Sequence, residues 1–152
     1  MKVRKLLCPR CSEYRDAAHE IENRRHVVNG FEFWCDDSHY NCLTCGEELS
    51  DPDVPDFMVP IFDAYREKAG LLSTAELKAV RENLGLSQVA FATLLGMSPA
   101  TIVRYEQGSP HNDKEDVLFR LAALKGALPM LLKVRGHLLQ PGQLPRPKPR
   151  DA

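Results

Sequence analysis

The chain has 152 residues, of which 43% are hydrophobic and 27% are charged, a composition typical of globular proteins with one domain or two small ones. Its first residues contain no apolar run long enough for a signal peptide, and no segment approaches the roughly 20 apolar residues of a membrane span. These features argue against secreted and membrane proteins. We therefore expect a cytoplasmic protein in which disulfides do not form.

The net charge of −1 conceals a gradient along the chain. Residues 1–60 carry seven Lys and Arg against twelve Asp and Glu, whereas residues 113–152 carry eight against four. Such asymmetry indicates two surfaces with different partners, unless both are simply solvated faces. The acidic front suits a basic protein, and the basic end suits phosphate.

All five cysteines lie within the first 45 residues, and four of them form two CxxC pairs, Cys8–Cys11 and Cys42–Cys45. Zinc prefers four tetrahedral ligands, and one CxxC turn places two thiolates on the same metal. Gly46 directly follows the second pair and allows the backbone to turn with positive φ. The pattern predicts a closed structural site holding one Zn²⁺ per chain, with the ligands Cys8, Cys11, Cys42 and Cys45.

Other uses of these cysteines fit less well. A thioredoxin-like redox site needs one CxxC at the start of a helix, and a catalytic zinc leaves one position open to water. We therefore do not expect an enzyme. Cys35 and His39 lie between the pairs and could replace a ligand, but a half-buried strand thiol beside Trp34 is the favoured role for Cys35.

The segment between the cysteine pairs predicts a β-hairpin, because Asn29-Gly30 lies between the β-branched and aromatic stretches Arg25–Val28 and Phe31–Trp34. Turn residues after Ser50 end the predicted zinc domain, residues 1–50. A linker with a short helix follows over residues 51–72, with Gly70 at its end. Its apolar positions at helical spacing are Met58, Ile61, Phe62 and Tyr65.

Residues 73–139 predict an all-helical domain, which makes the whole chain an α+β protein: a small zinc domain with a hairpin, then helices. A capping box at Ser73 opens the first helix, and Ser87 and Ser98 cap helices over Gln88–Leu95 and from Pro99 to about Gln107. A further helix covers Asp113–Lys125. The expected inward residues are Leu77, Val80, Leu84, Phe91, Ala92, Leu95, Ile102, Tyr105, Val117, Leu118, Leu121 and Ala122. Residues 140–152, rich in proline and cations, are expected to be a disordered tail.

The run S-Q-x-x-F-A-x-x-L-G-M-S-x-x-T-I-x-R-Y-E-x-G from Ser87 to Gly108 resembles the XRE/Cro-type helix-turn-helix, and the resemblance covers about residues 74–125. It implies a helix that reads the major groove of DNA, with Tyr105 in the core and Glu106 bracing the fold. Gln88 would bond a phosphate or brace this recognition helix. Pro99 and Ala100 have no side-chain hydrogen bonds to offer, so they suit thymine methyl groups. The implied DNA-binding residues are Gln88, Ser98, Pro99, Ala100, Thr101 and Arg104, with Arg104 on a guanine or a phosphate.

A small, neutral helix-turn-helix binds DNA weakly alone, so we expect a homodimer on a palindrome. The apolar helix after Gly126 offers a dimer surface, although it could equally close the core of the monomer. Its apolar residues are Leu128, Met130, Leu131, Leu132 and Val134.

Over about residues 6–135 the chain resembles the MqsA-type antitoxins, in which a YgiT-like zinc domain precedes an XRE-type helix-turn-helix. The resemblance rests on the C-P-x-C and C-x-x-C pairs, the linking helix and the run Val103–Glu106. It implies a dimeric repressor of its own promoter whose zinc domain neutralises a small basic RNA-cleaving toxin. The family pattern has Asn where this chain has Ala100, so the bases read must differ. The alternative is a freestanding zinc-ribbon regulator without a toxin, and a toxin-sized neighbouring reading frame would discriminate the two.

Overall fold

A computed structural model describes residues 1–54 and 56–145 of the chain. The chain divides into two compact units, Met1–Tyr65 and Arg66–Ala152, so that the division falls within the predicted linker segment, residues 51–72. The first unit contains an antiparallel sheet with the cysteine cluster, and the second consists of helices. The expected α+β fold class is confirmed, whereas the boundaries at residues 50 and 73 stay predictions.

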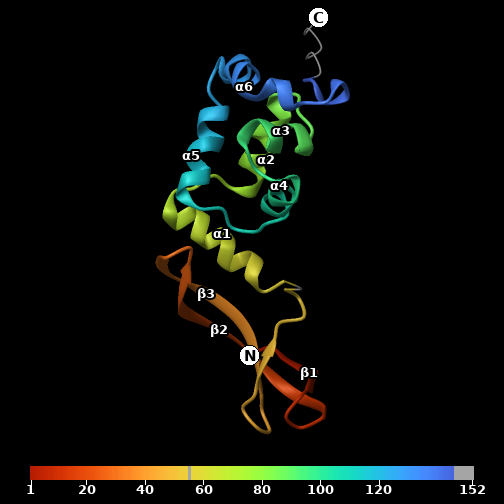
Figure 1. Ribbon diagram of the computed structural model, residues 1–152. Coiled ribbons are helices and arrows are strands. Elements are labelled where there is room, and N and C mark those ends of the chain that lie inside the picture. The colour runs from red at the N-terminus through yellow and green to blue at the C-terminus, as the bar shows by residue number, and fades with distance from the viewer. Residues whose placement is uncertain (55, 146–152) are drawn as a thin grey trace, which may run out of the picture. The chain divides into compact units, whose positions relative to one another are not determined.

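The sheet has four strands in the order β1-β2-β3-β4, all antiparallel (Figure 1). The two long strands form the predicted hairpin, in which Val28 pairs with Phe31. Asn29 and Gly30 have φ values of 49° and 78°, as the type I′ turn between two strands requires. Strands β1 and β4, which the sequence analysis did not predict, add one neighbour on each side. The strands are β1 Val3–Cys8, β2 Glu13–Val28, β3 Phe31–Cys42 and β4 Glu48–Ser50.

The far half of the β2–β3 hairpin has two different faces. Phe33 is buried on one face, and its ring lies 6.2 Å, between centroids, from that of Tyr65 in α1. Side chains alternate between the two faces of a strand. Ile21, Val27 and Trp34 therefore lie on the opposite face from Phe33, and all three are exposed. On the edge that faces away from β3, strand β2 pairs with β1 only as far as His19. Beyond His19, no strand formed by the described residues pairs with this edge. This face also carries the pairs Arg25–Glu32 and Asn23–Asp36, so this half of the hairpin presents a mixed polar and apolar face and open edges.

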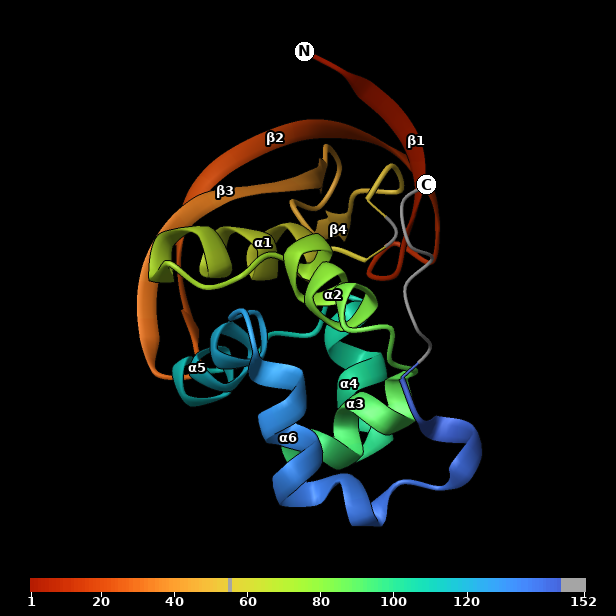
Figure 2. The same cartoon turned by 90° about the horizontal axis from the view of Figure 1, so that it is seen from above.

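The helices begin where the sequence places their caps, as Figure 2 lets the reader follow. Ser73, Ser87 and Ser98 each accept a hydrogen bond from the backbone N–H three residues ahead. The helix expected to end at about Gln107 ends at Glu106 with Gln107 as its C-cap, whereas the helix expected to reach Lys125 ends earlier, at Ala122. The helices are α1 Met58–Ala69, α2 Thr74–Asn83, α3 Gln88–Leu95, α4 Pro99–Glu106, α5 Asp113–Ala122 and α6 Ala127–Arg135, followed by the 3₁₀ helices η1 Gly136–Leu138 and η2 Pro141–Gln143.

In the helical unit, the inward faces of α3 and α5 differ from the prediction. In α3, Leu94 is fully buried and Leu95 only partly so. In α5 the buried residues are Asp116, Phe119 and Ala122, whereas Val117, Leu118 and Leu121, which were expected inside, are exposed. The prediction for α5 followed apolar side chains alone and missed that a charged residue lies on the buried face. The buried apolar residues of the unit are Leu77, Val80, Leu86, Ala90, Phe91, Ala92, Leu94, Ile102, Phe119 and Ala122.

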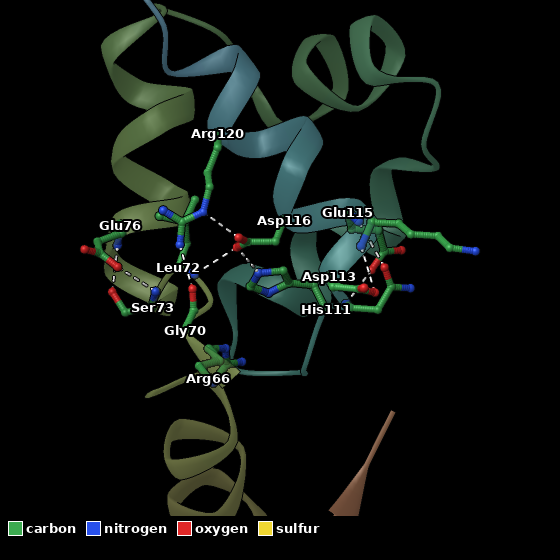
Figure 3. Close-up of polar contacts among 12 residues, drawn as sticks. Arg66, Gly70, Leu72, Ser73, Glu76, His111, Asp113, Glu115, Asp116 and Arg120 are labelled. Atoms are coloured by element: carbon green, nitrogen blue, oxygen red, sulfur yellow. Dashed lines mark hydrogen bonds and ion pairs between the residues drawn. The ribbon is translucent and has the colours of Figure 1, made fainter. Parts of the chain in front are cut away.

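Asp116 fixes the direction in which α5 faces (Figure 3). Its carboxylate accepts hydrogen bonds from the backbone N–H of Leu72 at 2.8 Å and from Arg120 Nε at 2.6 Å, and His111 Nε2 lies 2.8 Å away. Burial raises the pKa of this carboxyl, but the bonds from Arg120, Leu72 and His111 outweigh burial and leave the pKa below its ordinary value. A buried carboxylate is stable only with such partners, so these contacts allow Asp116 to lie on the inward face of α5 while its apolar neighbours face outward.

No helix within residues 1–54 and 56–145 is long and apolar enough to cross a membrane. The predicted tail begins at residue 140. Its described part contains η2, and its residues 146–152 lie outside the described part of the chain.

Candidate metal centre and DNA-binding helices

Four cysteines from distant parts of the first unit meet in one cluster. Their Sγ atoms all lie within 4.8 Å of one another, and the Sγ atoms of Cys8 and Cys45 are 3.5 Å apart. A tetrahedral site with metal–sulfur bonds of about 2.3 Å has sulfur–sulfur edges of about 3.8 Å. The cluster is thus close to the size that a metal such as zinc needs, and the predicted ligands Cys8, Cys11, Cys42 and Cys45 are the residues brought together.

The sheet positions these thiols. Cys8 is the last residue of β1 and Cys42 the last of β3, while Cys11 and Cys45 lie in the turns that follow. Gly46 has φ +74° and donates its N–H to the Cys42 carbonyl at 2.8 Å, as its place after the pair predicts. This turn aims the backbone N–H groups of Cys45 and Thr44 at the Cys42 sulfur, and they lower the pKa of that thiol to about 7. The turn therefore favours the thiolate at Cys42, the form that binds metal, whereas the hydrogen bond with Cys45 and burial raise the pKa of Cys11 to about 12.

Cys35 and His39 are not part of the cluster. Cys35 is buried within β3, the role that its strand position favours. His39 is also buried, and its Nε2 lies 3.4 Å from Arg24 Nη2 and 3.3 Å from Asn41 Nδ2. Four thiolates complete a tetrahedron, so the arrangement suits a metal that holds the fold rather than one that binds a substrate.

In the second unit, α3 and α4 are joined by a tight turn in which Gly96 has φ +73°. A buried carboxylate, Glu106 at the end of α4, joins three helices. It accepts a hydrogen bond from Arg81 Nε in α2 at 2.6 Å and one from Gln88 Nε2 in α3 at 2.7 Å. Burial raises the pKa of Glu106, but Arg81 and Gln88 outweigh burial and lower it below its ordinary value. Gln88 thus holds the end of α4, and its contact with DNA stays a prediction.

The first turn of α4 faces solvent. Ser98, Pro99, Ala100 and Arg104 are exposed, and Thr101 is partly so. Ser98 Oγ accepts the N–H of Thr101 at 3.2 Å and lies 2.9 Å from its hydroxyl, which in turn is 3.5 Å from Arg104 Nη2. A row of polar groups therefore runs along the outer face of α4 and ends at the Arg104 guanidinium.

Sequence reasoning missed two arginines that hold this motif. Arg81 reaches Glu106 from 25 positions away. Arg66 is buried and donates to the carbonyls of Gly108 and Ser109, just after α4. Their partners are distant in sequence, and no local pattern marks such pairs. The only sequence signal for such a contact is an arginine at a helix position that otherwise faces the core.

Comparisons with known proteins agree with this geometry. Residues 74–132 match the model of a family described as a helix-turn-helix domain, and no curated protein matches the chain. The match begins at the first residue of α2 and ends within α6. Residues 74–132 of the second unit are thus similar to helix-turn-helix domains, a motif that DNA-binding proteins use.

Proposed function

We propose that the chain is a zinc-containing antitoxin that represses its own promoter. In this proposal the second unit binds a palindromic operator as a homodimer, and the first unit binds and neutralises a small basic toxin. The observation that carries the DNA-binding part is the exposed first turn of α4 within a matched helix-turn-helix domain. The toxin-binding part rests on the resemblance to MqsA-type antitoxins and on the acidic, partly apolar first unit.

Arg104 is the main candidate for reading bases. It is exposed, and its guanidinium can bind the O6 and N7 acceptors of guanine with two hydrogen bonds. Ser98 Oγ is already engaged in capping α4, and Thr101 lies between Ser98 and Arg104. Pro99 and Ala100 present apolar surface that suits thymine methyl groups. Ser98 and Thr101 thus support Arg104, which carries the specific contact.

Replacing Arg104 by alanine tests this assignment. We expect a loss of roughly 1–3 kcal/mol in operator binding and a relaxed preference at one base pair per half-site, since a bidentate contact is lost. Binding is measured by fluorescence anisotropy with the DNA upstream of the gene and with single-base variants. Thr101→Ala should cost less. Unchanged binding by both variants would show that α4 does not read the operator.

A second copy of the chain would cover the apolar surface that α5 and α6 expose. Leu118, Leu121, Leu124 and Met130 line a hollow of ≈ 320 Å³ between these helices. Leu121 is 53% exposed and Met130 72% exposed, whereas Leu128, Leu131 and Leu132 pack partly against the core. One side of the helix after Gly126 thus contributes to the core, while its other side exposes apolar surface that the proposed second copy would cover.

Leu121→Lys tests the dimer surface, because a lysine there places a charge in the apolar contact. We expect the wild-type chain to sediment as a dimer and this variant as a monomer with weaker operator binding. Val89→Lys, on an exposed valine of α3 outside this hollow, serves as the control and should remain dimeric. A dimer that persists in Leu121→Lys places the interface elsewhere.

The outer face of the β2–β3 hairpin is the surface that we assign to the toxin. It contains the only tryptophan of the chain, Trp34, which is 55% exposed and pairs with Arg25, two positions from the exposed Val27 on the same face. Exposed tryptophans of this kind often dominate protein interfaces. The excess of acidic residues in positions 1–60 suits a basic partner.

Co-expression with the product of the neighbouring gene, followed by co-purification, tests this assignment. We expect Trp34→Ala to lower the yield of the complex at least tenfold, while Tyr14→Ala, at an exposed aromatic near the other end of β2, retains it. Equal capture by both variants would exclude this face. If the wild-type chain captures nothing and no toxin-sized gene adjoins it, the freestanding regulator is the correct function.

Zinc is the metal we propose for the four-cysteine cluster, at one ion per chain. Because a small sheet has little apolar core, metal binding supplies much of its folding free energy. Chelation or Cys42→Ser should therefore unfold the first unit, which Trp34 fluorescence reports, and leave the helical circular dichroism largely unchanged. Cys35→Ser is the matched control and should keep its zinc. Loss of metal from Cys35→Ser would contradict the ligand set.

A further inference from the structure

A hollow of ≈ 350 Å³ within the first unit has no part in the functions proposed above. Side chains alternate along β3, so Asp37 and His39, which line the hollow, lie on the opposite face of the sheet from Trp34. Met58 and Ile61 of α1 add apolar surface to it. A hollow of this volume, with apolar surface and a few polar groups, is typical of sites that bind small organic molecules.

One polar group in this hollow is a buried hydrogen-bond donor. His39 is 4% exposed, and its Nε2 lies 3.4 Å from Arg24 Nη2 and 3.3 Å from Asn41 Nδ2. Both of these nitrogens donate, because a guanidinium has no acceptor and because Asn41 Nδ2 also donates to Glu20 at 2.9 Å, which fixes the orientation of the amide. Nε2 is therefore the acceptor, and the neutral imidazole carries its proton on Nδ1.

The Nδ1–H of His39 has no hydrogen-bond partner among the described residues, although it is shielded from solvent. Buried polar groups in folded proteins almost always have a partner, because a buried donor without an acceptor destabilises the fold. The hollow beside His39 has room for a ligand that provides this acceptor.

The carboxylates on this face define the charge of the hollow. Arg24 Nε donates to Glu22 at 2.8 Å, and its two terminal nitrogens donate to Glu48 at 3.0 and 2.8 Å. Among the described contacts, Asp37 accepts only a long bond of 3.4 Å from Arg24 Nη1, and its side chain is 18% exposed. Asp37 can therefore accept a second donor. Three carboxylates around one guanidinium also leave a net negative charge here.

His39 and Asp37 together select a ligand by its chemistry. They are two residues apart on one face of β3, about 6.6 Å along the strand, with a donor at one position and a charged acceptor at the other. An oxygen acceptor on the ligand suits His39 and an amine suits Asp37, while hydrocarbon suits Met58 and Ile61. A ligand carboxylate is disfavoured, because the negative charge of the hollow repels it.

We propose that this hollow binds a small aliphatic amine that carries a neutral oxygen acceptor, such as an amide or hydroxyl group. The amine binds the Asp37 carboxylate, and the oxygen accepts the Nδ1–H of His39. The site is formed by residues of the first unit alone, on the other face of the sheet from Trp34. The proposal therefore does not depend on DNA or toxin binding.

The test is a titration of the full, isotope-labelled and zinc-loaded chain with three probes, followed by nuclear magnetic resonance. L-Leucinamide has the amine, the carbonyl and the hydrocarbon, whereas L-leucine replaces the amide by a carboxylate and isocaproamide lacks the amine. We expect leucinamide to shift the backbone amide signals of β3 and of the start of α1 in a saturable way. The other two probes should bind at least tenfold more weakly. Because a ligand of this size has limited affinity, the titration extends to about 20 mM.

Asp37→Asn and Asp36→Asn form a matched pair of variants, since each removes one negative charge from neighbouring positions of β3. Asp36 is exposed on the opposite face, outside the hollow. We expect Asp37→Asn to weaken leucinamide binding at least tenfold and to leave isocaproamide binding nearly unchanged, whereas Asp36→Asn changes neither. His39→Gln retains an oxygen that can accept from Arg24 but has no donor at the Nδ1 position, so it should weaken the binding of both amides.

Absence of saturable shifts with leucinamide would overturn the proposal, as would shifts confined to residues outside the hollow. Equal affinity for leucine and leucinamide would contradict the role of the carboxylates. An equal loss in Asp36→Asn and Asp37→Asn would show that net charge, rather than Asp37, attracts the amine. If His39→Gln does not fold, the Asp36 and Asp37 variants decide the question on their own.

Discussion

A buried carboxylate holds three helices of the second unit together: Glu106, in the last turn of α4, binds Arg81 of α2 and Gln88 of α3. Removing one partner of such a group would leave an uncompensated charge in the core, which costs several kcal/mol. The three helices are therefore fixed as one body, and α4 can present its first turn without losing its own packing. Asp116 has the same role on the other side of the unit, where it fixes the rotation of α5.

The two units achieve stability by different means. The helical unit has a continuous core, from Leu77 in α2 to Phe119 in α5, into which buried polar contacts are built. The first unit has a smaller buried cluster around Tyr40, of which two members, Cys8 and Cys42, also belong to the four cysteines positioned to bind a metal ion. A change in metal supply would thus act on the first unit alone, and the helix-turn-helix would keep its structure. This separation suits a protein whose two surfaces serve different partners.

Local chemistry explains what the sequence could predict. Serine caps, left-handed glycines, the Asn29-Gly30 turn and the paired cysteines act within a few residues, and the structure agrees with each. The remainder depends on contacts between distant residues. Strand β4 has only three residues, and Arg66 finds its partners more than 40 positions away. The inward face of α5 was predicted wrongly because hydrophobic spacing cannot reveal that Asp116 will be buried with its donors.

The tight turn at Asn29-Gly30 also bears on the order of folding. It joins two strands that pair along their length, from Val28 with Phe31 to Ala17 with Cys42. A hairpin of this kind needs little loop closure and forms within about 1–10 μs. As strand pairing proceeds from the turn, Cys42 comes to lie at the same end of the sheet as Cys8 and Cys11. The long loop between the cysteine pairs is then closed before a metal ion binds. We therefore expect the metal to bind after the strands have paired, when the four cysteines already lie close together. The rate of binding should then depend on the supply of metal ions rather than on the time that the chain needs to bring the cysteines together.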